Sequence, residues 1–245
     1  MKIVRACGHT FIMDWLNSSS TIVDLGLNRG GFSSRMSRLV GCRIYGAEPD
    51  PIMFERLPEI PGLSKLQAAV CGEDGMVEFH VNSTQCSSML FRQQTGQGGM
   101  TTSVRSVTLP TFLKINNLDR VELLKADIEG AEVDMFDHTP DELLQRVDQI
   151  TIEFHDFMDS ALGPGVARVR QQLRRLGFHE LDFSRNRMDV LYVNMRSHPI
   201  SSLAKLDLIA TKYRRGLSRI LGRVAGKQDL GDDGFDVDRL SVGSP

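Results

Sequence analysis

The sequence predicts an α/β domain whose mostly parallel sheet carries helices on both faces. Apolar strand patterns alternate with segments of helical periodicity through most of the 245 residues, which is typical of parallel sheets. A glycine-rich segment, residues 26–31, directly follows an apolar strand, as in nucleotide-binding sheets. With 41% hydrophobic and 24% charged residues, the composition excludes a disordered, collagen-like or disulfide-dense chain. The absence of any run of about 18 uncharged apolar residues excludes a polytopic membrane protein.

The first part of the chain contains three apolar segments that predict buried strands. Residues 8–17 come before them and have Phe11, Ile12, Trp15 and Leu16 at helical spacing, which predicts a short helix. The strands are expected at 21–26, 43–48 and 66–70, with helices near 31–40 and 52–60 between them.

The remaining elements continue this rhythm after a change in the middle. Residues 76–81 alternate apolar and polar side chains, as a half-exposed strand does, and the polar, glycine-rich residues 82–100 predict a mobile loop. We then expect a strand at 103–109, a helix at 111–118, strands at 121–128 and 149–157, a helix at 166–177 and an antiparallel pair at 179–183 and 189–195.

Charge divides the chain near residue 196, so we predict one domain at 1–195 and two appendages. Residues 196–228 carry eight Lys or Arg against one acid, and their periodicity predicts a C-terminal basic amphipathic helix over 201–225. That helix is expected to touch an anionic membrane weakly, to pack on the domain, or to form a homodimer. Residues 229–245 carry five Asp against one Arg and predict an acidic disordered tail.

The charge and the cysteine content also limit which partners the protein is expected to bind and in which cellular compartment we expect it. A net charge of −2 and 7% aromatic residues make nucleic acid an unlikely partner. The four cysteines show no C-x-x-C pair, and Arg5, His9 and Asp14 interrupt any apolar core of a signal peptide. We therefore expect a cytoplasmic protein, with peripheral contact at the inner membrane face if the basic helix binds lipid.

The glycine loop after the first buried strand is a candidate cofactor site. Asp24 ends the strand, Gly26 and Gly30 lie in the loop, and Glu48 ends the next strand, where a carboxylate can bind a ribose diol. The alternative is an ordinary strand-to-helix turn with a surface glutamate. The G-x-x-x-G-G spacing favours S-adenosylmethionine over NAD, since a pyrophosphate would be repelled by Asp24.

The most unusual stretch is the ionisable cluster of residues 125–132. Parallel strands end at the same edge of a sheet, so this cluster is expected beside the end of the next strand. The residues concerned are Lys125, Asp127, Glu129, Glu132, Glu153 and His155. The structural alternatives are a helix-capping Glu132, a Lys125–Glu153 ion pair and a core His155. An Asp–Glu–His group can also hold a divalent metal, but nothing in the spacing requires one, and we predict none.

Together these residues resemble the FkbM family of S-adenosylmethionine-dependent methyltransferases, over about residues 21–195. The family motif V-D-x-G-x-N-x-G-x-x-S stands at 23–33, its E-P pair at 48–49, and its K-x-D-x-E-G-A-E signature at 125–132. Leu27 and the pair at 109–110 depart from the family pattern. The resemblance implies the Rossmann-like class I methyltransferase fold with seven strands, adds Asn28 and Ser33 to the cofactor-binding residues, and implies O-methylation of sugars or natural products.

For such a reaction we expect His155 to act as general base, because its ordinary pKa is near ~6.5. Asp127 would orient the acceptor or the cofactor, while Lys125 and Glu153 would tune neighbouring pKa values. The alternatives are an NAD-dependent sugar-nucleotide oxidoreductase, for which no Tyr-x-x-x-Lys pair is present, and a non-catalytic binding module with the same fold. A third, less favoured, is a nucleic-acid methyltransferase that uses the basic segment.

Overall fold

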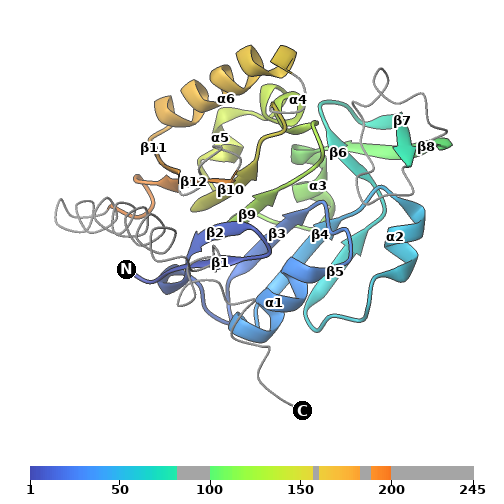
Figure 1. Ribbon diagram of the computed structural model, residues 1–245. Helices are drawn as coiled ribbons and strands as arrows, with labels where there is room; N and C mark the ends of the chain where they lie inside the picture. The colour runs from blue at the N-terminus through green and yellow to red at the C-terminus, as the bar shows by residue number, and fades with distance from the viewer. Residues whose placement is uncertain (82–99, 157–159, 183–188, 200–245) are drawn as a thin grey trace, which may run out of the picture.

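The computed structural model describes residues 1–81, 100–156, 160–182 and 189–199, and its centre is a seven-stranded sheet (Figure 1). The strand order is β11-β12-β10-β9-β3-β4-β5. Five strands are parallel, and β12 runs antiparallel between β10 and β11. The bounds are β3 Thr21–Leu25, β4 Arg43–Ala47, β5 Leu63–Leu66, β9 Leu123–Ala126, β10 Gln149–Glu153, β11 Phe178–Asp182 and β12 Asp189–Asn194. The predicted mostly parallel sheet and its terminal antiparallel pair are confirmed.

Alternation of apolar side chains along the strands gives the sheet two buried faces. On β3, Ile22 packs on one face with Phe32 and Met36 of α1. The next residue, Val23, faces the opposite core, which contains side chains of α3, α4, α5 and α6. The helices are α1 Gly31–Val40, α2 Pro51–Arg56, α3 Leu109–Ile115, α4 Glu132–Asp137, α5 Asp141–Leu144 and α6 Gly163–Arg175, with short 3₁₀ turns at Met13–Trp15 and Ser160–Leu162. Because helices cover both faces of the sheet, we look for a functional site at the polar ends of the strands.

The N-terminus forms a hairpin, so the prediction of a helix at 8–17 is wrong. Strands β1 (Ile3–Ala6) and β2 (His9–Ile12) pair across a two-residue turn at Cys7 and Gly8. Both turn residues have positive φ, at 47° and 88°, as a type I′ turn requires. The amide of Gln149 on β10 accepts from Ile12 N at 2.8 Å and donates to Ile12 O at 3.1 Å, so the hairpin is fixed across the sheet.

A second sheet, of three strands, lies beyond the carboxyl ends of β4 and β5. It has the order β6-β8-β7, with bounds β6 Ala69–Cys71, β7 Gly75–Val81 and β8 Met100–Thr108. The single strand predicted at 66–70 is therefore two strands of different sheets, since Leu66 ends β5 and Ala69 begins β6. The chain changes direction between them, and β6 and β7 form a wall beyond the main sheet (Figure 1).

Several predictions concern residues outside the described part of the chain. The mobile loop at 82–100 falls there except for its last residue, as do the basic helix at 201–225 and the acidic tail at 229–245. Within the ranges that the structure describes, no helix combines the length and apolar character needed to cross a membrane.

Candidate active site

The loop between β3 and α1 approaches the end of β9 closely. Gly26 has φ of 81°, and a Cβ there would lie 1.9 Å from the backbone oxygen of Asp127. Asn28 also has positive φ, at 49°. Only glycine fits at Gly26, so the turn is fixed by sterics as well as by backbone conformation. The loop thereby leaves room for a ligand at the carboxyl end of the sheet.

Glu48, one residue beyond β4, is held by backbone donors. Its Oε2 accepts from Asn28 N at 2.6 Å, and its Oε1 accepts from Asp50 N at 2.9 Å. Burial raises the pKa of Glu48, although these two hydrogen bonds and Lys125 act in the opposite direction. Asp50 in turn caps α2 by accepting from Ile52 N and Met53 N. Each Glu48 oxygen keeps acceptor capacity for a ligand hydroxyl.

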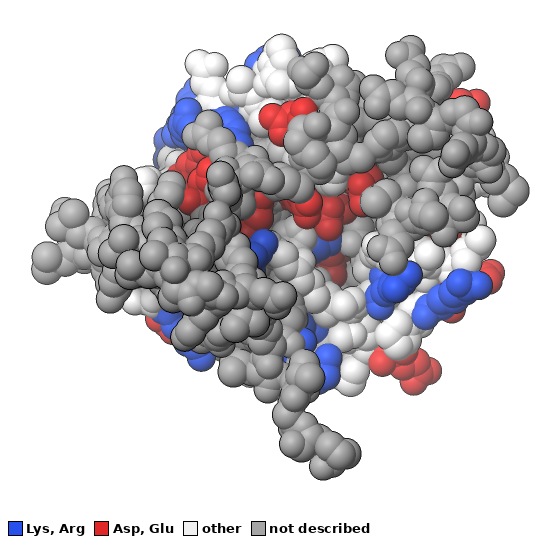
Figure 2. All heavy atoms as spheres, in the orientation of Figure 1, with Lys and Arg blue, Asp and Glu red and all other residues white. Residues whose placement is uncertain are grey.

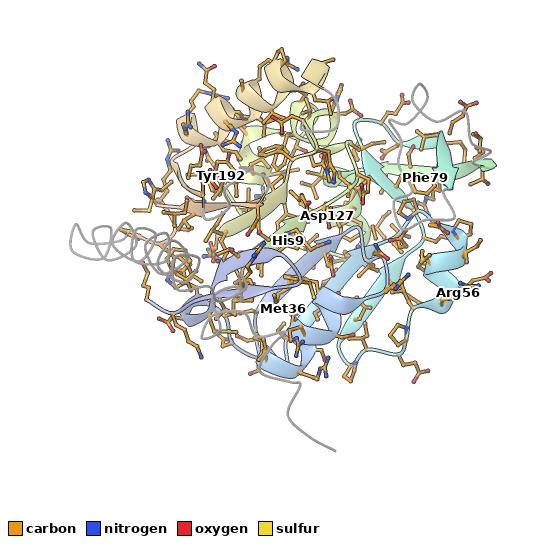
Figure 3. All side chains as sticks on the ribbon, in the orientation of Figure 1. His9, Met36, Arg56, Phe79, Asp127 and Tyr192 are labelled. Atoms are coloured by element: carbon orange, nitrogen blue, oxygen red, sulfur yellow. The ribbon has the colours of Figure 1, made fainter. Side chains whose placement is uncertain are left out.

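A pocket of about 730 Å³, counting space open to solvent, lies beside this loop. One wall is apolar and includes Met53, Val70 and Phe79, while Glu48 and Asn28 line the polar side. Figure 3 shows Phe79 in the small sheet, across from the end of the main sheet. This combination suits a flat heterocycle that carries a diol.

A second hollow adjoins this pocket on the side of the N-terminal hairpin. Gly26, Asn28 and Asp127 line both spaces, and Cys7 and His9 line the second one only. The two spaces therefore adjoin at the glycine loop.

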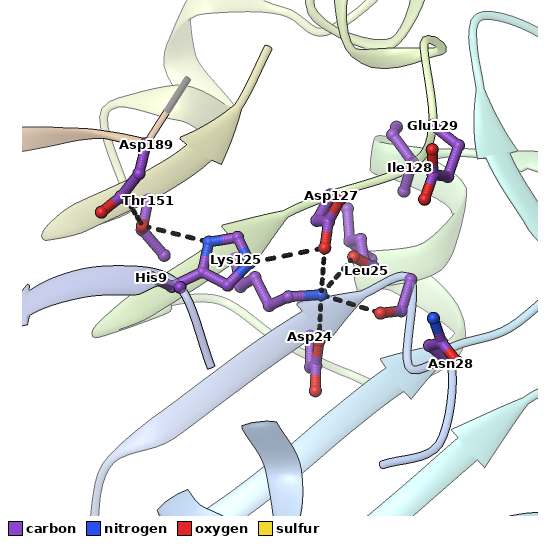
Figure 4. Close-up of polar contacts among 12 residues, drawn as sticks. His9, Asp24, Leu25, Asn28, Lys125, Asp127, Ile128, Glu129, Thr151 and Asp189 are labelled. Carbon is purple, nitrogen blue, oxygen red and sulfur yellow. Dashed lines mark hydrogen bonds and ion pairs between the residues drawn. The ribbon is translucent and has the colours of Figure 1, made fainter. Parts of the chain in front are cut away.

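Behind the loop lies a buried ion pair. Lys125 Nζ is 3.0 Å from Asp24 Oδ1, and it also donates to Leu25 O at 3.2 Å and Gly26 O at 2.7 Å (Figure 4). Ser33 Oγ donates to the second oxygen of Asp24 at 2.6 Å. These contacts support the backbone of the glycine loop.

Three of the residues predicted to bind the cofactor lie away from both spaces. Asp24 and Ser33 are fully buried under the loop and line neither pocket, and Gly30 packs against Leu57 and Ile60. Lys125 pairs with Asp24 rather than with Glu153. It also lines the second hollow and lies 3.6 Å from Asp127 Oδ2, where its charge lowers the pKa of that carboxylate, in line with the predicted influence on a neighbouring pKa. Local sequence could not give this result, since a motif shows which residues follow one another and not which side of the loop they occupy.

Three partly exposed carboxylates, Asp127, Glu129 and Glu153, form what we call the acidic edge. They come from the ends of the neighbouring strands β9 and β10, as the sequence predicts. Figure 2 shows Asp and Glu side chains gathered around a hollow at the centre of this face. Burial alone would raise the pKa of Asp127, but the Lys125 ammonium and the His9 ring hold it well below its ordinary value.

His155 lies between carboxylates on both sides of its ring. Its Nδ1 is 3.0 Å from Glu132 Oε1, and its Nε2 is 3.3 Å from Glu129 Oε2 and 3.8 Å from Asp127 Oδ1. Burial alone would lower the pKa of His155, but these carboxylates raise it to about 9. A ring that is protonated at neutral pH cannot accept a proton there, which argues against His155 as general base.

Glu132 and Glu129 shape the turn that carries this cluster. Glu132 is 2% exposed and accepts hydrogen bonds from Ile128 N and Gly130 N, which stabilise the turn. The same carboxylate contacts His155 and so fixes the position of its ring. Glu129 has φ of 52°, a left-handed conformation. Burial and the repulsion of Asp127 and Glu132 raise the pKa of Glu129 to about 7, although His155 acts in the opposite direction.

His9 is a site residue that the sequence analysis missed. Its ring is 1% exposed, with Nε2 3.4 Å from Asp127 Oδ2 and Nδ1 3.4 Å from Thr151 Oγ1. Figures 3 and 4 show it directed from the hairpin toward Asp127. The glycine of the two-residue turn before it, between two apolar runs, was the available signal.

Two groups in the described part of the chain have ligand atoms close enough to share a metal ion. One is His9, Asp127 and Glu153, and the other is Asp127, Glu129 and His155; within each group the ligand atoms lie within 4.8 Å of one another.

Comparison with known proteins shows that this chain is similar to methyltransferases. The model of the methyltransferase FkbM domain matches residues 24–180. The chain is 30% identical over 162 residues to "Methyltransferase 1" of Beauveria bassiana, covering 56% of this chain and 65% of that protein. Over 61 residues it is 39% identical to the AMB antimetabolite synthetase AmbE of Pseudomonas aeruginosa, or 25% of this chain and 3% of AmbE. The chain thus spans less than two thirds of either relative.

Solved structures with a similar arrangement include two archaeal fibrillarins. The Methanococcus jannaschii protein, a pre-rRNA processing protein, is 12% identical with a TM-score of 0.43, over 78% of this chain and 80% of its own. The Aeropyrum pernix protein, solved with bound S-adenosyl-L-methionine, is 13% identical with a TM-score of 0.38, over 73% of this chain and 66% of its own.

Proposed function

Since this chain belongs to the FkbM methyltransferase family, we propose that it transfers a methyl group from S-adenosylmethionine to a hydroxyl of a sugar, glycan or natural product. The single observation that carries the proposal is that two spaces adjoin at the glycine loop. The pocket with Glu48 and the hollow beside His9 share Gly26, Asn28 and Asp127. A nucleoside pocket that opens onto a polar edge is what methyl transfer from this cofactor requires.

The residues that line the two spaces support one orientation of the cofactor. Glu48 is the partner for the ribose hydroxyls, and Met53, Val70 and Phe79 line the side that suits the adenine ring. The methionine part then passes over Gly26 toward the hairpin. This orientation would bring the sulfonium near Asp127, whose negative charge would attract it.

The acceptor would lie at the acidic edge. Asp127, Glu129 and Glu153 can accept hydrogen bonds from hydroxyl groups and would repel a phosphate. This charge supports a neutral or cationic polyhydroxyl acceptor and disfavours nucleic acid and phosphorylated sugars.

The reaction is an in-line displacement, to which positioning contributes most. The acceptor oxygen forms a bond to the methyl carbon, and the electron pair of the breaking C–S bond goes to sulfur. The hydroxyl proton passes to a carboxylate of the acidic edge, and the products are a methyl ether and S-adenosylhomocysteine. His9 would hold the Asp127 carboxylate in place through the 3.4 Å contact.

Tritium transfer from methyl-labelled S-adenosylmethionine tests the proposal. Purified protein is incubated with neutral glycosides, aminoglycosides, the matching phosphorylated sugars and a polynucleotide. We expect label in a base-stable methyl ether of a neutral or amino sugar. Preferential labelling of a phosphorylated acceptor or a polynucleotide, or label in an ester or a methylamine, would contradict the acceptor class.

A further inference from the structure

We propose that Glu129 is the catalytic base of the methyl transfer, the one carboxylate of the acidic edge that accepts the proton of the acceptor hydroxyl. The inference rests on the proposed function and narrows it from three carboxylates to one. It also gives a role to the two side chains behind Glu129, since His155 positions the base and Glu132 positions His155.

The three carboxylates of the acidic edge differ in their surroundings. Glu153 lines neither the pocket nor the second hollow. Asp127 lines both spaces, but its Oδ2 lies 3.4 Å from His9 Nε2 and 3.6 Å from Lys125 Nζ. A proton on Asp127 would take counter-charge away from the buried Lys125 ammonium, which is costly. Glu129 remains, and it lines the pocket with a side chain that is 27% exposed.

The backbone of Glu129 supplies an independent observation. Its φ of 52° lies in the left-handed region, which glutamate rarely adopts and which glycine adopts without strain. The turn is held in this form by Glu132, which accepts hydrogen bonds from Ile128 N and Gly130 N. Strained backbone of this kind gathers at active sites, where it directs a side chain toward the reacting group. The turn therefore presents a carboxylate to the pocket despite an unfavourable conformation.

A histidine lies behind the Glu129 carboxylate and fixes its direction. His155 Nε2 is 3.3 Å from Glu129 Oε2, and His155 Nδ1 is 3.0 Å from Glu132 Oε1. Because both ring nitrogens face carboxylates, both donate a hydrogen, and the ring has no atom left to accept a proton. A reactive group held by a second side chain, which a third side chain orients, is the usual arrangement of acid–base sites.

The proton transfer balances with the displacement at carbon. The acceptor O–H bond breaks, and its proton passes to a carboxylate oxygen of Glu129. The oxygen electron pair forms the bond to the methyl carbon, while the C–S pair goes to sulfur. The negative charges of Asp127 and Glu132 repel that of Glu129, so the gain of a proton relieves this repulsion. After the products leave, Glu129 returns the proton to water.

Tritium transfer from methyl-labelled S-adenosylmethionine to neutral glycosides and aminoglycosides tests the inference. We expect kcat to fall about 100-fold or more in Glu129→Gln, because a general base contributes by this factor. The acceptor KM and the affinity for S-adenosylhomocysteine should stay within about 3-fold of the wild type, since only the transition state loses an interaction. Glu142→Gln is the control, because Glu142 is exposed on α5, and it should match the wild type. Equal kcat in Glu129→Gln and the wild type, or loss only in Glu153→Gln, would overturn the inference.

Chemical rescue separates a base from a structural carboxylate. Glu129→Gly removes the carboxylate and suits the positive φ, so this variant should unfold at no lower temperature than the wild type. Sodium formate supplies a small carboxylate, and it should raise the transfer rate of Glu129→Gly about 10-fold or more without changing that of the wild type. Absence of rescue in the folded variant would overturn the role of base.

The positioning role of His155 has its own readout. His155→Gln should lower kcat about 10-fold while the acceptor KM stays unchanged, because the base loses its direction and no binding contact is lost. An unchanged kcat would remove His155 from the mechanism. If the wild type labels none of these acceptors, the proposed function and this inference both fail. If the wild type transfers the methyl group and Glu129→Gln does so equally well, only this inference fails.

Discussion

Lys125 Nζ lies 3.0 Å from Asp24 Oδ1, and this ion pair joins the ends of β9 and β3 in the interior of the protein. Both side chains are at most 4% exposed. Burial alone would lower the pKa of Lys125, but Asp24 and Asp127 raise it above its ordinary value, so the ammonium stays charged. Because Nζ also donates to the carbonyls of Leu25, at the end of β3, and of Gly26, in the glycine loop, the pair sets the position of the backbone that faces the cofactor pocket.

Replacing Lys125 with Met should destabilise the protein by about 3–5 kcal/mol, because it leaves the Asp24 carboxylate buried without a counter-charge. Urea unfolding followed by circular dichroism measures this difference. Lys114→Met is the matched control, since Lys114 is exposed on α3 and should change stability by less than about 0.5 kcal/mol. A cost for Lys125→Met as small as that of the control would show that the pair does not hold the loop.

Gly26→Ala should abolish cofactor binding and lower stability. A Cβ at this position would meet the Asp127 carbonyl at 1.9 Å while φ stays at 81°, so the loop or the end of β9 must move. Calorimetry with S-adenosylhomocysteine and thermal unfolding report the two effects. Gly163→Ala is the control, because its Cβ would meet nothing within 4 Å and its φ is not positive, and it should bind the ligand normally. Normal binding by Gly26→Ala would place the cofactor elsewhere.

Cysteine labelling should map the second hollow. Cys7 is exposed and lines that hollow, whereas Cys42 is buried and burial raises its pKa to about 11. In a Cys86→Ser background at pH 8, iodoacetamide should therefore modify Cys7 and leave Cys42 unreacted, because almost no Cys42 thiolate is present. Peptide mass spectrometry follows the reaction. Saturating S-adenosylhomocysteine should slow the labelling of Cys7 several-fold; an unchanged rate would exclude the ligand from the hollow.

The parts of the fold that depend on local pattern could be predicted from the sequence. Helix α1 matches its predicted range, since Phe32 and Met36 give an apolar face and Gly41 ends the helix with positive φ. The positions of Gly26 and Glu48 in the site could also be predicted, because each residue follows the end of a parallel strand and these carboxyl ends lie at one edge of the sheet.

Features that depend on contacts distant in sequence could not be predicted. His9 meets Asp127 across 118 residues, and Asp24 meets Lys125 as its register partner on the adjacent strand β9. The wrong helix at 8–17 arose because a four-residue strand and a 3₁₀ turn together gave a helical spacing. The raised pKa of His155 depends on where three carboxylates of residues 127–132 lie relative to the ring, which periodicity does not give.

The measurement closest to the central claim is a calorimetric titration of S-adenosylhomocysteine into wild-type protein, Glu48→Ala and the exposed control Glu55→Ala. We expect micromolar affinity for the wild type, about −7 to −8 kcal/mol. Loss of the charged partner of the ribose hydroxyls should weaken Glu48→Ala by roughly 1–3 kcal/mol, while Glu55→Ala should match the wild type. Absence of binding to the wild type, or equal affinity in Glu48→Ala, would contradict the account of the cofactor site.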